Sequence, residues 1–142
     1  MNKILIVNAN YYKSISVDLI KSANNVLKKF HAKSNIVKVP GVFEIPVTIR
    51  RHIKKYDGFI ALGCVIKGET PHFDLISKSV FDGLIKISID FNKPIGNGII
   101  TALTKTQAEK RSSLNKKKYK PNKGSEAAHA VISVLSKKPK KN

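Results

Sequence analysis

Four short apolar runs, separated by segments of helical periodicity, constrain the fold of this 142-residue chain more than any other feature. Each run is rich in branched apolar residues, which is typical of buried strands. The predicted strands cover residues 3–7, 35–39, 58–62 and 98–103. In the segments between and after them, apolar residues recur every three or four positions, which predicts helices. These helices are expected at residues 15–30, from Pro46 onward, and at 72–90, 106–111 and 125–135.

Strands that alternate with helices through short connections predict an α/β fold, in which helices flank both faces of a four-stranded parallel sheet. Ligands of such sheets bind beyond the carboxyl ends of the strands. The connections at that edge are expected at residues 8–13, 40–44 and 63–74 and at the turn after Ala102. Candidate site residues are therefore sought in these loops.

The length and composition are those of one globular domain over residues 1–142. Hydrophobic residues make up 42% and charged residues 25%, which excludes wholesale disorder, although we expect the basic tail at 137–142 to be disordered. A single cysteine, Cys64, excludes an internal disulfide and fits a reducing cytosol. No apolar stretch has the length of a signal-peptide core or a membrane span, so we expect a cytoplasmic protein.

The net charge of +18 admits two interpretations. A strongly basic protein can bind nucleic acid through phosphate contacts. However, the lysines are spread over most of the chain, without zinc-finger spacing, an aromatic RNA-binding signature or a basic reader helix. We therefore favour basic residues on solvated faces, which would also attract anionic substrates, and keep nucleic-acid binding as a competing hypothesis.

The loop at residues 63–74 combines the end of a buried strand, two glycines and the start of a long helix. Free N–H groups and the positive end of the helix dipole make such a junction suitable for an anion. The segment GCVIKGET nearly fits a nucleotide-binding P-loop, but Glu69 occupies the position of the lysine and would repel a triphosphate. A single phosphate is the remaining candidate ligand; alternatively, Glu69 and Thr70 only cap the helix.

Several side chains near these loops could take part in binding or catalysis. His72 could carry protons, because an imidazole can both accept and donate them, with a purely structural role as the alternative. Cys64 has no neighbouring base in the sequence and is expected to be a buried filler and not a nucleophile. Glu44 could hydrogen-bond a polyhydroxylated ligand, and Tyr11 and Tyr12 could provide a stacking surface. No set of histidine, cysteine or carboxylate residues has the spacing of metal ligands, so no metal is expected.

Five motifs, in this order along the chain, resemble those of the 6,7-dimethyl-8-ribityllumazine synthase family. They are VPGVFEIP at 39–46, ALGCVIKGETPHFD at 61–74, NGIIT at 97–101, QAEKR at 107–111 and NKGSEAA at 122–128. The resemblance covers nearly the whole chain and implies a flavodoxin-like three-layer α/β sandwich. It also implies a transferase of riboflavin biosynthesis that needs no cofactor or metal. Members condense 5-amino-6-(D-ribitylamino)uracil with 3,4-dihydroxy-2-butanone 4-phosphate and release phosphate and water.

The resemblance further implies roles for individual residues. Tyr11 would stack on the pyrimidine ring, and His72 would carry protons. The other residues that bind the pyrimidine and ribityl groups would be Val42, Phe43, Glu44, Cys64, Val65, Ile66 and Lys123, with Asn97 supplied by a neighbouring subunit. The phosphate would be bound by Glu69, Thr70 and Arg111.

Three features depart from the family pattern. Asn97 stands where many members have Phe or Trp, Glu69 replaces a smaller residue, and the connection at 112–122 is longer than in capsid-forming members. Because family sites lie between subunits, the resemblance implies a homo-oligomer, and the longer connection favours an isolated homopentamer. The expected partners are the small-molecule substrates and no membrane; these are favoured over a nucleic acid, which stays the competing hypothesis. A relative that binds flavin or lumazine without catalysis is a further alternative.

Overall fold

The computed structural model describes residues 1–68, 72–115, 122–137 and 139. In this part of the chain, four strands form one sheet in the order β2-β1-β3-β4, and every neighbouring pair is parallel. The strands are β1 (Lys3–Ala9), β2 (Lys33–Val39), β3 (Gly58–Ile66) and β4 (Ile95–Ala102). The helical elements are α1 (Lys13–Lys29), η1 (Val42–Glu44), α2 (Ile45–Arg51), α3 (Phe73–Phe91), α4 (Lys105–Ser112) and α5 (Lys123–Ser136). The predicted α/β fold with a four-stranded parallel sheet is confirmed.

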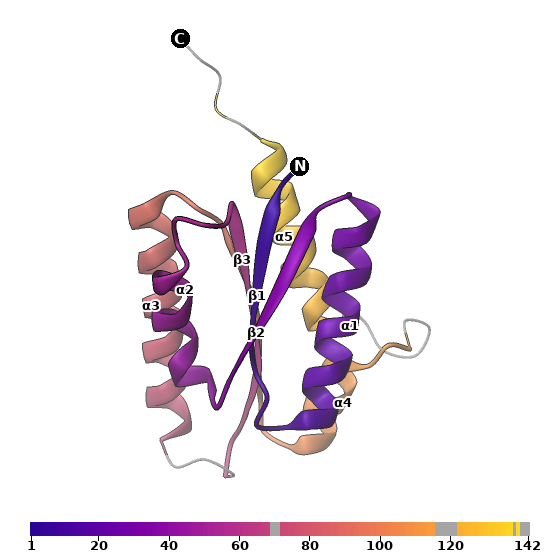
Figure 1. The fold of residues 1–142 in the computed structure, drawn as a ribbon. Coiled ribbons are helices and arrows are strands. Elements are labelled where there is room, and N and C mark those ends of the chain that lie inside the picture. The colour runs from indigo at the N-terminus through magenta and orange to yellow at the C-terminus, as the bar shows by residue number, and fades with distance from the viewer. Residues whose placement is uncertain (69–71, 116–121, 138, 140–142) are drawn as a thin grey trace.

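Helices cover both faces of the sheet (Figure 1): α1, α4 and α5 lie on one face, and α2 and α3 on the other. Successive side chains of a strand point to opposite faces. Ile4 and Ile6 of β1 accordingly join the core under α1 and α5, whereas Leu5 and Val7 join the core under α2 and α3. Burial on both faces explains why the strands are continuously apolar in the sequence.

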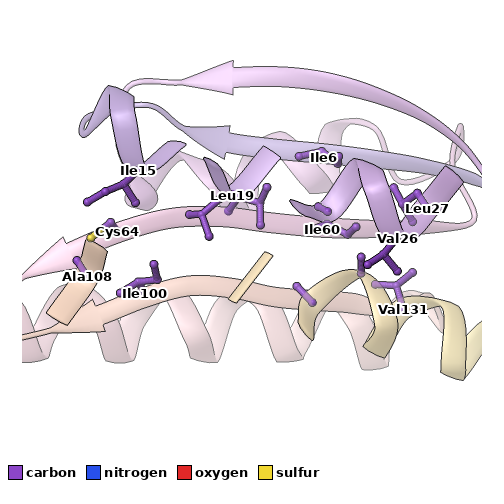
Figure 2. Close-up of a cluster of buried hydrophobic side chains, with 14 of the residues drawn as sticks. Ile6, Ile15, Leu19, Val26, Leu27, Ile60, Cys64, Ile100, Ala108 and Val131 are labelled. Atoms are coloured by element: carbon purple, nitrogen blue, oxygen red, sulfur yellow. The ribbon is translucent and has the colours of Figure 1, made fainter. Parts of the chain in front are cut away.

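Figure 2 shows the core between the sheet and α1, α4 and α5, where side chains of α1 point toward the strands. Leu19 of α1 and Ile60 of β3 are fully buried in it. Burying a side chain of this size contributes about 1.5–3 kcal/mol. This packing fixes α1 against the sheet and thereby positions the loop between β1 and α1, which carries Tyr11 and Tyr12.

The third strand is longer than the sequence predicted. It continues to Ile66, so residues 63–66 belong to the sheet and not to a turn. They pair with residues 99–102 of β4 and are buried. Gly63 is needed for space, because a Cβ atom there would lie 2.8 Å from Cγ1 of Val42. At Gly68, by contrast, the backbone lies in the left-handed region that favours glycine, with a φ of 87°.

The other predicted elements are all present, with ends that differ by at most three residues. The predictions for Glu69, Thr70 and most of the basic tail at 137–142 lie outside the described residues. Among the residues that are described, no helix has the length and apolar character needed to cross a membrane.

Candidate active site

A cavity of about 150 Å³ lies at the carboxyl ends of β1 and β3, the edge at which parallel sheets bind ligands. The end of β1, the loop that follows it, η1 with the preceding turn, the last part of β3 and the first turn of α3 form its walls. The lining residues are Ala9, Tyr11, Tyr12, Gly41, Val42, Phe43, Cys64, Val65 and Ile76. The fold therefore brings together five residues that the sequence proposed for one site, namely Tyr11, Val42, Phe43, Cys64 and Val65.

Two aromatic side chains in this lining are largely exposed. Tyr11 is 64% and Phe43 66% exposed. The ring of Tyr11 meets that of Tyr12 edge to face, with 4.9 Å between the ring centroids. Exposed aromatic rings beside an apolar cavity offer flat surfaces on which a planar heterocycle can stack.

A larger cavity of about 620 Å³ shares Phe43 with the first and lies between η1, α2 and α3. Its lining residues are Phe43, Glu44, Pro46, Val47, Ser79, Val80 and Gly83. The Glu44 carboxylate folds back toward Gly41, since Oε1 lies 3.3 Å from the position that a Cβ atom of Gly41 would take. The two cavities therefore place an acceptor for hydroxyl groups next to an apolar recess.

Cys64 forms part of the wall of the first cavity and is only 7% exposed. Burial raises the pKa of its thiol to about 12, because the low-dielectric surroundings disfavour the thiolate. The thiol is therefore neutral near pH 7 and a poor nucleophile. The prediction of a buried filler is confirmed.

The main chain of β3 also faces the cavity. β3 pairs with β1 only as far as Leu62, but with β4 as far as Ile66. Beyond Leu62, the edge of β3 on the side of β1 lies outside the strand pairing, and Cys64 and Val65 line the cavity there. Ile66 is buried in the core under α1 and does not line the cavity.

His72 immediately precedes α3 and is exposed. Its backbone is left-handed, with φ 65° and ψ 37°, a conformation in which histidine is found more often than most residues. The His72 carbonyl accepts a hydrogen bond of 2.9 Å from the N–H of Ile76, which lines the cavity. One helical turn therefore separates the predicted proton carrier from a cavity wall.

Arg111, in the last turn of α4, is anchored at the same edge of the sheet. Its Nη1 donates a hydrogen bond of 3.0 Å to the carbonyl of Thr101. Thr101 pairs in register with Val65, a cavity residue. Lys123 begins α5 and forms an ion pair with Glu126 at 3.4 Å. In the described part of the chain, neither Arg111 nor Lys123 lines the cavity. The structure brings both cations to the edge of the sheet at which the cavity lies, but not into its wall.

Asn122 holds the ends of α4 and α5 together. Its Oδ1 caps α5 by accepting from the N–H groups of Gly124 at 2.7 Å and Ser125 at 3.1 Å. Its Nδ2 donates to the carbonyls of Ser112 at 2.7 Å and Ser113 at 3.1 Å. This buried side chain therefore fixes the separation between the helix that carries Arg111 and the helix that carries Lys123.

Asn97 lies apart from the other candidates. It is an exposed residue of β4, the edge strand, and its Oδ1 accepts a hydrogen bond of 3.0 Å from the N–H of Ile99. It lines a separate cavity of about 280 Å³ between β4 and α3, together with Phe81, Leu84, Ile85, Ser88 and Ile95. Within one chain, Asn97 does not meet the cavity that contains Tyr11.

The sequence did not single out Ala9, Gly41 or Ile76, which also line the first cavity. Ile76 could have been found, because it lies four residues after His72 and so shares its side of the helix. In the described ranges, no cluster of three or more histidine, cysteine or carboxylate residues could hold a metal ion.

A comparison with protein families shows to which family the chain belongs. The family model of 6,7-dimethyl-8-ribityllumazine synthase matches residues 1–138. The chain belongs to the 6,7-dimethyl-8-ribityllumazine synthase family. The resemblance that the five motifs indicated is thus confirmed, and the function is that of a lumazine synthase, a transferase of riboflavin biosynthesis.

Curated lumazine synthases of several bacteria are similar over nearly the whole chain. The protein named 6,7-dimethyl-8-ribityllumazine synthase in Bartonella henselae is 40% identical, over 95% of this chain and 87% of the relative. Those of Bartonella tribocorum and Methylobacterium radiotolerans are each 38% identical, over 95% and 96% of this chain and 89% and 82% of their own lengths. The four-stranded parallel sheet agrees with the flavodoxin-like fold of lumazine synthases.

Proposed function

We propose that the chain condenses ribitylaminouracil with the four-carbon keto phosphate at the cavity between β1, η1 and β3. The convergence of Tyr11, Val42, Phe43, Cys64 and Val65 on that cavity supports this site more than any other observation. The pyrimidine ring stacks on the exposed face of Tyr11. Main-chain groups of Cys64 and Val65, which line the cavity, bind its polar edge, and Ile66, the next residue of β3, supplies a further main-chain group.

The ribityl chain occupies the larger cavity on the other side of Phe43. Val42, Phe43 and Glu44 hold it, with the Glu44 carboxylate accepting hydrogen bonds from hydroxyl groups. Pockets that bind small molecules commonly have volumes of about 300–1,000 Å³, and the 620 Å³ cavity is within that range. The smaller apolar cavity then takes the ring alone.

The phosphate of the second substrate binds at the start of α3. Glu69 and Thr70, which lie outside the described residues, precede that helix in the sequence, and its N-terminus attracts anions. Arg111 neutralises the phosphate as it leaves: one guanidinium donor is used on Thr101, and four others are available. Lys123 adds a second cation from α5.

His72 transfers the protons. Imine formation, phosphate elimination and ring closure each require a proton to be removed or supplied, and an imidazole can do both near neutral pH. Its hydrogen bond with Ile76, which lines the cavity, supports a position near the bound ring. Holding both substrates in one geometry provides much of the remaining acceleration.

The enzyme works as a homopentamer with sites between subunits, in the cytoplasm, and residues 1–142 form a single lumazine-synthase domain. The exposed apolar residues Leu75, Ile85 and Ile89 give α3 an apolar flank, and Ile85 lines the cavity between α3 and β4 that contains Asn97. A neighbouring subunit that covers this flank would receive Asn97 at its own cavity. Light scattering is expected to give five times the chain mass of 15.7 kDa, and a monomer or a capsid-sized particle would refute the pentamer.

A comparison of two exposed phenylalanines tests the site. Phe43→Ala removes a ring shared by both cavities, whereas Phe30→Ala removes a ring at the C-cap of α1. Lumazine formation from the two substrates is followed by absorbance or fluorescence. We expect Phe43→Ala to raise KM for ribitylaminouracil about tenfold, which corresponds to about 1.4 kcal/mol, because the ribityl chain loses its contact with this ring. Equal KM values for the two variants would contradict the assignment of the cavity.

A further inference from the structure

The fold gathers basic side chains at the end of the molecule opposite the cavity. The strands begin and the helices α1, α2, α3 and α5 end there, at the top of Figure 1 beside the N-terminus. We refer to the following residues as the basic end: Lys3, Lys28, Lys29, Lys33, Arg50, Arg51, Lys54, Lys55, Lys93 and Lys137. Of the acidic residues that the structure describes, only Asp57 and Asp90 lie at this end.

Hydrogen bonds join the segments that carry the basic end at the starts of the strands. The N–H of Lys33 donates to the carbonyl of Asn2 at 2.9 Å, and the N–H of Asp57 donates to the carbonyl of Lys3 at 2.8 Å. The ammonium group of Lys93 donates at 2.6 Å to the main chain just beyond α2. Charges that are far apart in the sequence are thereby held on one rigid face.

Few of these charges are compensated. The ion pairs found in the described residues join Lys78 to Asp82, Lys86 to Asp90, and Lys123 to Glu126, so none involves a residue of the basic end. The carboxylate of Asp90 is already bound by Lys86 at 2.8 Å. That of Asp57 accepts the backbone N–H of Lys3 at 2.7 Å.

Helix dipoles explain only part of this distribution. Basic side chains in the last turn of a helix are stabilised by about 0.3–1 kcal/mol each, which accounts for Lys28 and Lys29 of α1. The same reason does not apply to Lys3 and Lys33, which begin strands. Selection for helix stability alone would not concentrate charge at the starts of the strands.

We propose that the basic end binds the sugar–phosphate backbone of a nucleic acid without sequence preference. Phosphate contacts by lysine and arginine supply essentially all of non-specific nucleic-acid binding. The sequence expectation of dispersed, solvated charge could not foresee this, because only the fold brings the residues to one end.

An anionic membrane is the main rival partner. Stable membrane docking combines charge with apolar groups that insert among the lipids. At the basic end the ring of Phe91 is covered by the guanidinium of Arg50, at 4.3 Å from the ring centroid. Phe30 contacts His129 edge to face, with 5.9 Å between the ring centroids. Because Ile89 and Val134 are also exposed at this end, the test below compares the oligonucleotide with anionic vesicles directly.

The test measures binding of a fluorescein-labelled 20-nucleotide thymidylate strand by anisotropy at 50–300 mM NaCl. We expect log K to fall with log salt with a slope of about −3, as for four phosphate contacts on a single strand. The triple variant Lys29→Gln, Lys54→Gln and Lys55→Gln should lose about 2 units of that slope and bind at least about tenfold more weakly at 50 mM NaCl.

The matched control is a triple variant with the same loss of charge elsewhere, Lys21→Gln, Lys38→Gln and Lys105→Gln. All three are exposed and lie outside the basic end. This control should bind like the unmodified chain, and both triple variants should retain lumazine synthesis. Three results would overturn the proposal: no binding at 50 mM NaCl, equal weakening in the two triple variants, or tighter binding to phosphatidylserine vesicles than to the oligonucleotide.

Discussion

Replacing Gly63 by alanine tests whether close packing between β3 and η1 shapes the cavity. A Cβ atom at position 63 would lie 2.8 Å from Cγ1 of Val42 and 3.1 Å from Cβ of Ala9. Ordinary carbon contacts begin at about 3.5 Å, so Val42 must move by about 0.7 Å or more. Overpacking of this kind costs about 1–3 kcal/mol. Because Val42 and Ala9 both line the cavity, the shift also distorts the binding site.

Thermal unfolding and steady-state kinetics measure the two effects of Gly63→Ala. For a domain of this size, a loss of 1–3 kcal/mol lowers Tm by about 3–12 °C. KM for ribitylaminouracil should rise severalfold, whereas KM for the keto phosphate should change less because its proposed site lies at the start of α3.

Gly83→Ala provides the matched control. A Cβ atom there would lie 3.5 Å from Pro46, which is an ordinary contact, and alanine in a helix interior is favoured over glycine by about 0.5–1 kcal/mol. Tm should therefore rise in this variant. If Gly63→Ala unfolds at the unmodified temperature and binds ribitylaminouracil equally well, the reasoning about this packing is wrong.

Four further predictions concern single residues. His72→Ala should slow turnover by about ten- to a hundredfold without lowering Tm, and an unchanged rate would remove this residue from the mechanism. Arg111→Ala should mainly raise KM for the phosphorylated substrate; an unaltered KM would show that the phosphate binds elsewhere. Because burial raises the pKa of Cys64 to about 12, iodoacetamide at pH 8 should modify it only after unfolding, and rapid labelling of the folded enzyme would contradict this. Asn122→Ala should cost about 1–3 kcal/mol in urea unfolding, since it removes a cap and a link to α4, whereas the exposed Asn25→Ala should change stability by less than about 0.5 kcal/mol.

Most of the fold could be predicted because parallel strands buried on both faces leave a distinctive pattern. The apolar runs and the helical periodicity located every strand and helix within a few residues. The main error was the end of β3, where glycine at position 63 suggested a turn. In the structure this glycine makes room for Val42, a residue 21 positions earlier, and such long-range packing cannot be deduced from local sequence.

The site was predictable where its residues follow consecutive strands, and less so elsewhere. Tyr11, Phe43 and Cys64 meet because the carboxyl ends of β1, β2 and β3 lie at one edge of the sheet. Asn97 does not join them within a single chain, since it belongs to the middle of the edge strand. Its proposed role depends on the assembly of subunits, which a single sequence does not encode in any local pattern. The same is true of the basic end, whose residues come from seven separate stretches of sequence between Lys3 and Lys137 and meet only in the folded chain.

A crystal structure of the enzyme with ribitylaminouracil bound tests the central claim most directly. The account predicts the pyrimidine ring against Tyr11 in the cavity lined by Cys64 and Val65, with the ribityl chain extending past Phe43 toward Glu44. Density for the ligand at any other place, such as the groove between β4 and α3, would contradict it.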